Sequence, residues 1–117
     1  MPNPHGVTQG IVRAIALALP GVTEGAHHGH ADFRVDGVFF LGFNPDGKWV
    51  NLRAAGANID AMVRADPLSY RDVWKGRCVG VDVTRVNRKA MRTLVADAHA
   101  FVAGLETRTK RRSVRKT

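Results

Sequence analysis

The residues best suited to chemistry lie in one short run near the start of the chain. The run contains His27, His28, His30, Asp32 and Arg34. Alternate side chains of an extended strand point to the same face, so His28 and His30 would lie together. Such a pair can supply two of the three protein ligands of a catalytic zinc, with Asp32 or Glu24 as a third. The alternative is that these imidazoles bond backbone groups at a strand junction. Because no HExxH motif or cysteine pair accompanies them, we predict no cofactor and keep only His28 and His30 as candidate metal ligands.

The sequence offers no complete catalytic set. A histidine oriented by Asp32 could act as a general base, but a matching nucleophile is missing. Cys78 is the single cysteine; Arg77 beside it would lower the thiol pKa, and the alternative is a small, half-buried strand residue. No glycine-rich phosphate loop or nucleotide motif is present. We therefore name no catalytic residue. The sequence leaves open whether the protein is an enzyme, and it favours a protein without enzyme activity.

The net charge of +8 is concentrated at the C-terminus. Residues 107–117 hold six of the 18 basic residues and no acid, which leaves 12 basic and 10 acidic residues in the body. The six are Arg108, Lys110, Arg111, Arg112, Arg115 and Lys116. We expect residues 1–106 to form one domain and 107–117 a disordered basic tail. Such a tail binds nucleic acid by releasing counterions, or serves only solubility.

Four cations of the body lie near predicted turns or strand ends. They are Lys48, Arg53, Lys75 and Arg77. A cation on a projecting turn reaches phosphate without being desolvated, although a solvated surface charge is the alternative for each. Trp49, Tyr70 and Trp74 would stack on unpaired bases or complete the core and its rim.

These features support three hypotheses. The first is a non-catalytic, weakly sequence-specific DNA-binding module that contacts phosphates through its turns and its tail. The second is a small-ligand or metal-binding domain that uses the histidine run at residues 27–32. The third is a protein-interaction adaptor with an open sheet face. The oligomeric state, monomer or homodimer, and any small-molecule ligand stay open.

The composition describes an ordinary globular domain. The chain has 117 residues, of which 44% are hydrophobic and 24% charged, as is typical of one folded domain. No apolar stretch approaches the roughly 20 residues that cross a bilayer, and the first residues lack the pattern of a secretory signal. A lone cysteine fits a reducing compartment. We expect no membrane partner and a cytoplasmic location.

Helical periodicity appears in three places. Residues 8–19 predict a first helix, capped by Thr8 and ended by Pro20. A short second helix starts at Asn58 and ends by residue 66, before a proline. The last helix has Asn87 as its N-cap, an apolar stripe on one side and Gly104 as its stop.

Between these helices the apolar period is two. From Val22 to Arg53 we expect three or four antiparallel strands, among them residues 33–35, 38–43 and 48–53, joined by the turns Asp36-Gly37 and Asn44 to Gly47. Residues 79–83 alternate again and predict a further strand. Residues 68–74 could be a loop with one helical turn. The order is helix, three strands, helix, two strands, helix, which predicts a two-layer α+β fold with an antiparallel sheet of about five strands packed against helices.

Two segments in fixed order resemble the MmcQ/YjbR family of small bacterial proteins. They are Leu19-Pro20-Gly21-Val22-Thr23-Glu24 and the segment from His27-His28-Gly29-His30 to Asp36-Gly37. Later features follow in the family's order, and the resemblance covers residues 8–103. It implies a CyaY-like fold in which two hairpins have been described as a double-wing DNA-binding motif. Here Arg77-Cys78 replaces an aromatic Gly-Trp pattern, and Gly80 replaces a bulkier strand residue.

Overall fold

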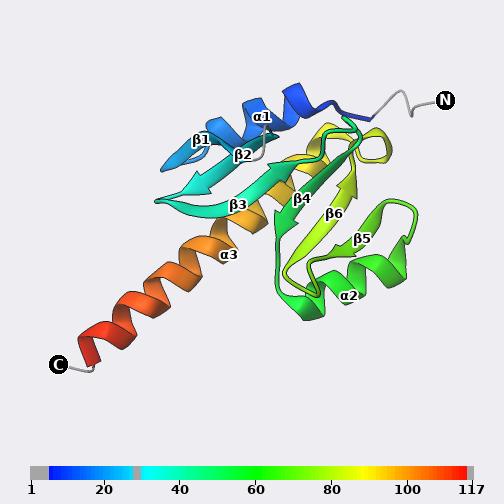
Figure 1. Ribbon diagram of the computed structural model, residues 1–117. Coiled ribbons are helices and arrows are strands. Elements are labelled where there is room, and N and C mark those ends of the chain that lie inside the picture. The colour runs from blue at the N-terminus through cyan, green and yellow to red at the C-terminus, as the bar shows by residue number, and fades with distance from the viewer. Residues whose placement is uncertain (1–5, 28–29, 116–117) are drawn as a thin grey trace.

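Ten elements build the chain in this computed structural model, shown in Figure 1. The structure describes the backbone of residues 6–27 and 30–115 and the side chains of residues 6–26 and 30–104. The elements are α1 (Gln9–Leu17), β1 (Val22–His27), β2 (His30–Val35), β3 (Val38–Phe43), β4 (Trp49–Arg53), α2 (Gly56–Ala65), β5 (Tyr70–Val73), β6 (Cys78–Asp82), a 3-10 turn η1 (Val83–Arg85) and α3 (Arg88–Arg115).

The strands form one antiparallel sheet in the order β1-β2-β3-β4-β6-β5. Helix α3 crosses behind β3 and β4, and α1 packs beside it (Figure 1). Helix α2 packs on β5 and β6, and Met62 from α2 and Leu94 from α3 line a common crevice. The predicted two-layer α+β fold is therefore confirmed. We call the sheet face opposite the helices the open face, because no helix of the described residues covers it.

The sheet has six strands where about five were expected, and the positions of two of them, β1 and β5, were not given by the sequence. The structure has a separate β1, which pairs with β2 from Val22↔Val35 to His27↔His30. Residues 70–73 form β5, a sheet edge, where the sequence suggested a loop with a helical turn. The four residues of β5 carry no clear apolar alternation, so their extended form depends on the ladder with β6. This dependence on a distant partner is invisible to local periodicity.

The helix ends follow the predicted caps in two cases out of three. Thr8 accepts a hydrogen bond from the Ile11 backbone N–H at 3.2 Å, and Asn87 accepts one from Ala90 at 2.8 Å. Helix α2 instead begins at Gly56, two residues before Asn58, and no side chain caps it. Backbone contacts from Ala55 start it: its carbonyl accepts from both Asn58 and Ile59 at 3.0 Å.

Helix α3 continues to Arg115, beyond the stop predicted at Gly104. A glycine ends a helix when it takes the left-handed conformation, and Gly104 has no positive φ. Side chains from residue 105 onward lie outside the described residues. The boundary between a domain at 1–106 and a tail at 107–117 stays a prediction.

A bulge in β3 changes which side chains of this strand point to the core and which to the open face. Phe33 pairs with Leu41 and Arg34 with Phe39, so Phe40 is an extra residue on β3. An extra residue bends a strand and redirects its side chains. Both Phe40 and Leu41 are buried in the core, and the ring of Phe40 meets His99 of α3 edge-on. Phe39 is thereby left for the open face.

The core lies between the sheet and the helices. Val50 and Leu52 of β4 and Val79 and Val81 of β6 are almost fully buried, as alternation in those strands predicts. Their partners on α3 include Met91, Val95, Ala98 and Val102.

None of the helices described here is long and apolar enough to span a membrane.

Candidate functional site

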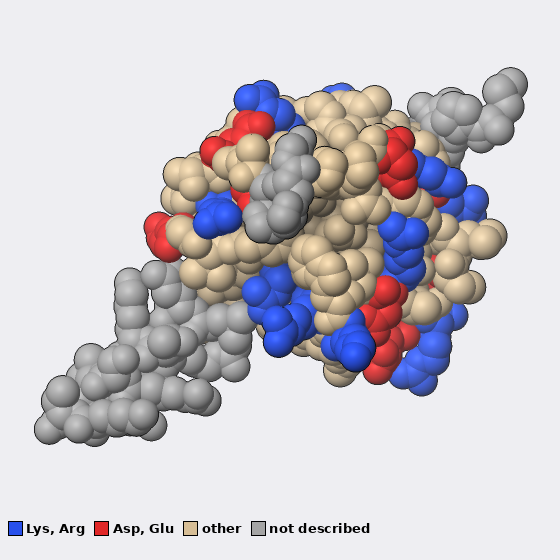
Figure 2. Space-filling view, viewed as in Figure 1, with Lys and Arg blue, Asp and Glu red and all other residues tan. Residues whose placement is uncertain are grey.

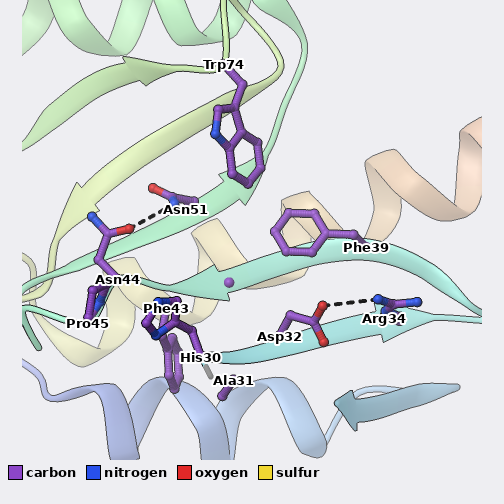
Figure 3. Close-up of a pocket in the computed structure, with 11 residues that line it drawn as sticks. His30, Ala31, Asp32, Arg34, Phe39, Phe43, Asn44, Pro45, Asn51 and Trp74 are labelled. Carbon is purple, nitrogen blue, oxygen red and sulfur yellow. Dashed lines mark hydrogen bonds and ion pairs between the residues drawn. The ribbon is translucent and has the colours of Figure 1, made fainter. Parts of the chain in front are cut away.

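A pocket of about 470 Å³ occupies the open face (Figure 3). It runs across β2, β3 and β4, and the turn between β5 and β6 overhangs it. Its wall consists of His30, Ala31, Asp32, Arg34, Phe39, Gly42, Phe43, Asn44, Pro45, Asn51 and Trp74. Apolar and aromatic walls with a few polar groups are typical of ligand pockets, which usually measure about 300–1,000 Å³.

The β2 side of the pocket carries an ion pair. Asp32 is 5% exposed, and its Oδ2 accepts a hydrogen bond from a terminal nitrogen of Arg34 at 3.2 Å. Asp32 Oδ1 is buried and has no hydrogen-bond partner among the described residues. Arg34 itself is exposed. A guanidinium has five N–H donors, so the bond to Asp32 orients Arg34 and leaves donors for another group.

Two aromatic rings meet at one end of the pocket. Phe39 and Trp74 lie with ring centroids 5.6 Å apart and planes tilted by 55°. Gly42 makes room for this arrangement, because a Cβ there would lie 2.9 Å from Phe39 Cε2. Trp74 is 56% exposed, and Figure 3 shows its indole extending from the turn toward Phe39.

The turn that carries Trp74 has an unusual backbone. Trp74, Lys75 and Gly76 have φ values of 57°, 51° and 83°. The left-handed region is rare for residues with a bulky side chain. Asp72 Oδ1 accepts a hydrogen bond from the Gly76 N–H at 2.7 Å, and this bond stabilises the turn.

Two asparagines line the pocket at its other end. Asn51 Nδ2 donates to Asn44 Oδ1 at 3.2 Å. Asn51 is 7% exposed, and its Oδ1 has no partner within the described part of the chain. The rings of Phe33 and Phe43 pack with centroids 5.3 Å apart nearby. This end is therefore apolar with amide groups set into it.

Only part of the predicted histidine run can be placed. His30 lies at the start of β2 and lines the pocket, as do Asp32 and Arg34. The side chains of His27 and His28 lie outside the described residues, so a pair of metal ligands at His28 and His30 stays a prediction. Across residues 6–26 and 30–104, no three His, Cys, Asp or Glu side chains come together as a metal site.

Three of the four cations that the sequence singled out in the body lie at one end of the sheet, which we call the basic end. They are Arg53, Lys75 and Arg77. Arg53 pairs with Cys78 at the junction of β4 and β6, and the Ala54 N–H donates to the Arg77 carbonyl at 3.4 Å. Lys75 and Arg77 are exposed. The guanidinium of Arg53 lies 5.6 Å from the ring centre of Phe101.

Lys48 lies at the opposite end of the sheet. Its turn joins β3 to β4, whereas the basic end is where β4 finishes and β6 starts. Lys48 Nζ lies 3.5 Å from Oδ2 of the buried Asp82. Asp46 Oδ1 accepts from the backbone N–H of Lys48 at 2.9 Å, and this bond lowers the pKa of Asp46. Lys48 is part of a structured turn and is separated from the other three cations.

The charges of the open side are mixed. Figure 2 shows Lys and Arg side chains spread around a largely uncharged centre, with several close together in its lower part and acids among them. Asp36 and Asp72 are exposed at the same end of the sheet as the basic end. The side chains of Arg108, Lys110, Arg111, Arg112, Arg115 and Lys116 lie outside the described residues.

Cys78 does not become a reactive thiol. Its side chain is fully buried, and burial raises its pKa to about 11, against the opposing effect of Arg53 and Arg77. Arg77 lowers the pKa as the sequence suggested, but desolvation of the charged form outweighs it, so of the two interpretations the reactive thiolate is wrong. Cys78 is a core residue of β6.

The other large aromatic residues have structural roles. The guanidinium of Arg71 stacks on Trp49 at 4.0 Å from the ring centre, in cation–π contact. Tyr70 packs against the core, and burial raises its pKa. Among the three aromatic residues considered from the sequence, Trp74 is the one that belongs to the pocket.

Sequence reasoning missed Phe39, Gly42 and Asn51 as pocket residues. Phe39 and Gly42 stand in an almost wholly apolar run, and only the bulge decides which face each takes. Asn51 did carry a signal, because a polar residue between Val50 and Leu52 marks the face of β4 turned away from the core.

The described features define a class of protein: a small α+β domain whose antiparallel sheet is covered by helices on one face and hollowed by a pocket on the other. The YjbR family matches residues 17–101, and the chain belongs to this family. A crystal structure of Deinococcus radiodurans protein DR2400, with a DUF419 domain, has the same fold, with a TM-score of 0.70 and 16% identity over 87% of this chain and 82% of that one. No curated protein matches the sequence.

Proposed function

We propose that this YjbR-family chain is a non-catalytic DNA-binding module that holds phosphates at its basic end. The observation that supports this most is the grouping of Arg53, Lys75 and Arg77 at one end of the sheet. Two of these cations are exposed on a turn or next to it. Contacts from such positions fix a protein on a nucleic acid without reading its bases, so we expect weak sequence preference.

Helix α3 leads from the same end. Phe101 of α3 lies beside Arg53, and in Figure 1 the helix then extends away from the body toward the C-terminus. The six basic residues between positions 108 and 116 follow in the sequence. In this proposal they add a second set of phosphate contacts that continues the basic end.

Lys48 is not part of the proposed surface. It lies at the other end of the sheet and pairs with Asp82. Asp36 and Asp72 lie near the basic end, and their negative charges reduce the attraction of this end for phosphate. We therefore expect moderate affinity with a clear dependence on salt. Action on DNA in a bacterial cytoplasm is part of the proposal.

The test is the affinity of the full chain for fluorescein-labelled DNA at several salt concentrations. Each phosphate neutralised contributes about 0.9 to the slope of log affinity against log salt on duplex DNA, and about 0.7 on single strands. The double variant Lys75→Gln/Arg77→Gln should lower the slope by about 1.8 on duplex DNA and about 1.4 on single strands. A slope near zero in the unmodified chain would overturn the proposal.

The chain offers a matched control. Lys89 and Arg92 are exposed on the first turns of α3, and Lys89→Gln/Arg92→Gln removes the same charge. That variant should keep most of the slope. Equal losses in both variants would mean that DNA responds to net charge alone and that no defined phosphate surface exists. A chain ending at residue 106 separates the tail from the basic end, which should retain binding by itself.

A further inference from the structure

We infer that the DNA bound at the basic end is single-stranded, and that one unpaired base stacks on Trp74, beside Phe39, at the mouth of the open-face pocket. This inference rests on the proposed function and names the form of DNA that this surface takes. Proteins that bind single strands combine cations along a backbone path with aromatic rings on which bases stack. The structure has both parts in the required order.

The stacking surface is formed by two rings from separate elements. Phe39 comes from β3 and Trp74 from the turn after β5, and their centroids lie 5.6 Å apart. More than half of the Trp74 surface is exposed. The two planes are tilted by 55°, so a base that lies flat on the exposed indole meets Phe39 at an angle, and tilted contacts of this kind are favourable between aromatic rings.

Cations lie on both sides of these rings. On one side Arg34 is the register partner of Phe39 across β2 and β3, and Asp32 orients its guanidinium. On the other side, Lys75 follows Trp74 directly and Arg77 lies two residues further on, in the turn between β5 and β6, which lie on the side of β3 away from β2. A single DNA strand that crosses this end of the sheet would meet a cation, two rings and two more cations in succession. The negative phosphates of that DNA strand would lie at the cations, and one base would lie between them at the rings.

The pocket next to the rings has the properties that an unpaired base needs. Its volume of about 470 Å³ falls within the usual range for organic ligands. Gly42 has no side chain, so it leaves space in the pocket beside Phe39 that a Cβ would fill. Asn44 and His30 at the far end carry donors and acceptors for a base edge. A paired base exposes neither its face nor its pairing edge, so duplex DNA cannot use this surface.

The backbone of the turn supports a functional role for Trp74. Its φ of 57° is sterically costly for a residue with a Cβ, and such conformations cluster at binding sites. Glycine would form this turn more readily. The turn therefore accepts strain in order to place an indole beside Phe39.

The direct test uses tryptophan fluorescence. The sequence has two tryptophans, and Trp49→Phe leaves Trp74 as the single reporter. Titration of that variant with a thymidine heptamer containing one guanine should quench the emission, because stacking on a base quenches indole. The same seven bases, held double-stranded in the stem of a hairpin closed by G·C pairs, should leave the emission within a few per cent of its starting value. Equal quenching by duplex and single strand would overturn the inference.

Affinity measurements on variants supply the second arm. Trp74→Leu should weaken single-strand binding by about 5- to 150-fold, as expected for the loss of one stacked base, and should change duplex binding by less than about twofold. Leu68→Ala is the control, since Leu68 is also an exposed apolar residue outside the pocket. Thermal unfolding shows that each variant is folded, and Trp74→Phe, which keeps a ring, should recover part of the affinity.

The two proposals fail in different ways. If DNA binds with a strong salt slope but Trp74→Leu affects single strand and duplex equally, phosphate binding stands and base stacking is overturned. If neither form of DNA binds with a salt slope, the proposed function falls, and the stacking inference falls with it. If only the single strand binds, and Trp74→Leu and Lys75→Gln/Arg77→Gln both weaken it, both proposals hold.

Discussion

Replacing Lys75 with glycine should stabilise the protein and weaken its binding to DNA. Lys75 has a φ of 51°, in the left-handed region that costs an L-residue about 1–2 kcal/mol. Glycine removes this cost but loses more conformational freedom on folding, worth about 0.5–1 kcal/mol. The net gain is about 0.5–1 kcal/mol in the free energy of unfolding, or roughly 2–5 °C in the melting temperature of a domain of this size.

The same substitution removes one cation of the basic end. We expect the slope of log affinity against log salt to fall by about 0.7 on a single strand. Calorimetry gives the melting temperature, and fluorescence anisotropy at several salt concentrations gives the slope. Opposite changes in stability and binding are the expected result, because the strain and the charge belong to one residue but act in different equilibria.

Lys75→Gln is the matched control, since it removes the charge and keeps the side chain on a left-handed backbone. It should lower the salt slope as much as Lys75→Gly and should leave the melting temperature nearly unchanged. A lower melting temperature for Lys75→Gly would refute the strain argument. An unchanged slope in both variants would refute the role of Lys75 as a phosphate contact.

Four further predictions concern the core and the pocket. Cys78, whose pKa of about 11 reflects its burial, should resist thiol reagents at pH 8 until denaturant is added, and fast native labelling would contradict its placement. Because the unfolded thiol ionises near pH 9 while the folded thiol stays protonated, stability should fall between pH 9 and about 11. Asp82→Ala should cost roughly 2–3 kcal/mol in a urea titration, since the backbone N–H and hydroxyl of Thr84 lose a buried charged acceptor at 3.0 and 2.7 Å; a loss below about 0.5 kcal/mol would argue against that network. Gly42→Ala should displace the Phe39 ring, because a Cβ there lies 2.9 Å from it, and so weaken single-strand binding; unchanged affinity would show that the position of Phe39 is not used.

Local signals predicted most of the fold because they act within a few residues. Thr8 and Asn87 satisfy N–H groups three positions away, and the Asp36-Gly37 turn has positive φ at both residues, as a two-residue hairpin requires. Two strands were expected after the second helix, but the first of them, β5, could not be placed from the sequence because its four residues gain their conformation from β6. That partner is fixed by the tertiary fold.

The candidate site was only partly predictable for the same reason. Alternation along one strand places His30, Asp32 and Arg34 on a common face, and all three line the pocket. Phe39 reaches that face only because of the bulge at Phe40, which no local pattern marks. The separation of Lys48 from the other cations follows from strand order, which sets which turns share an end of the sheet.

The most direct test of the account is to map the binding surface by NMR. Backbone amide shifts of the labelled full chain are followed as a thymidine heptamer with one guanine is added. We predict that the largest changes fall at Arg34, Phe39, Trp74, Lys75 and Arg77, with smaller ones at Arg53. Changes concentrated around Lys48 or on the first turns of α3, with the basic end unmoved, would contradict the account.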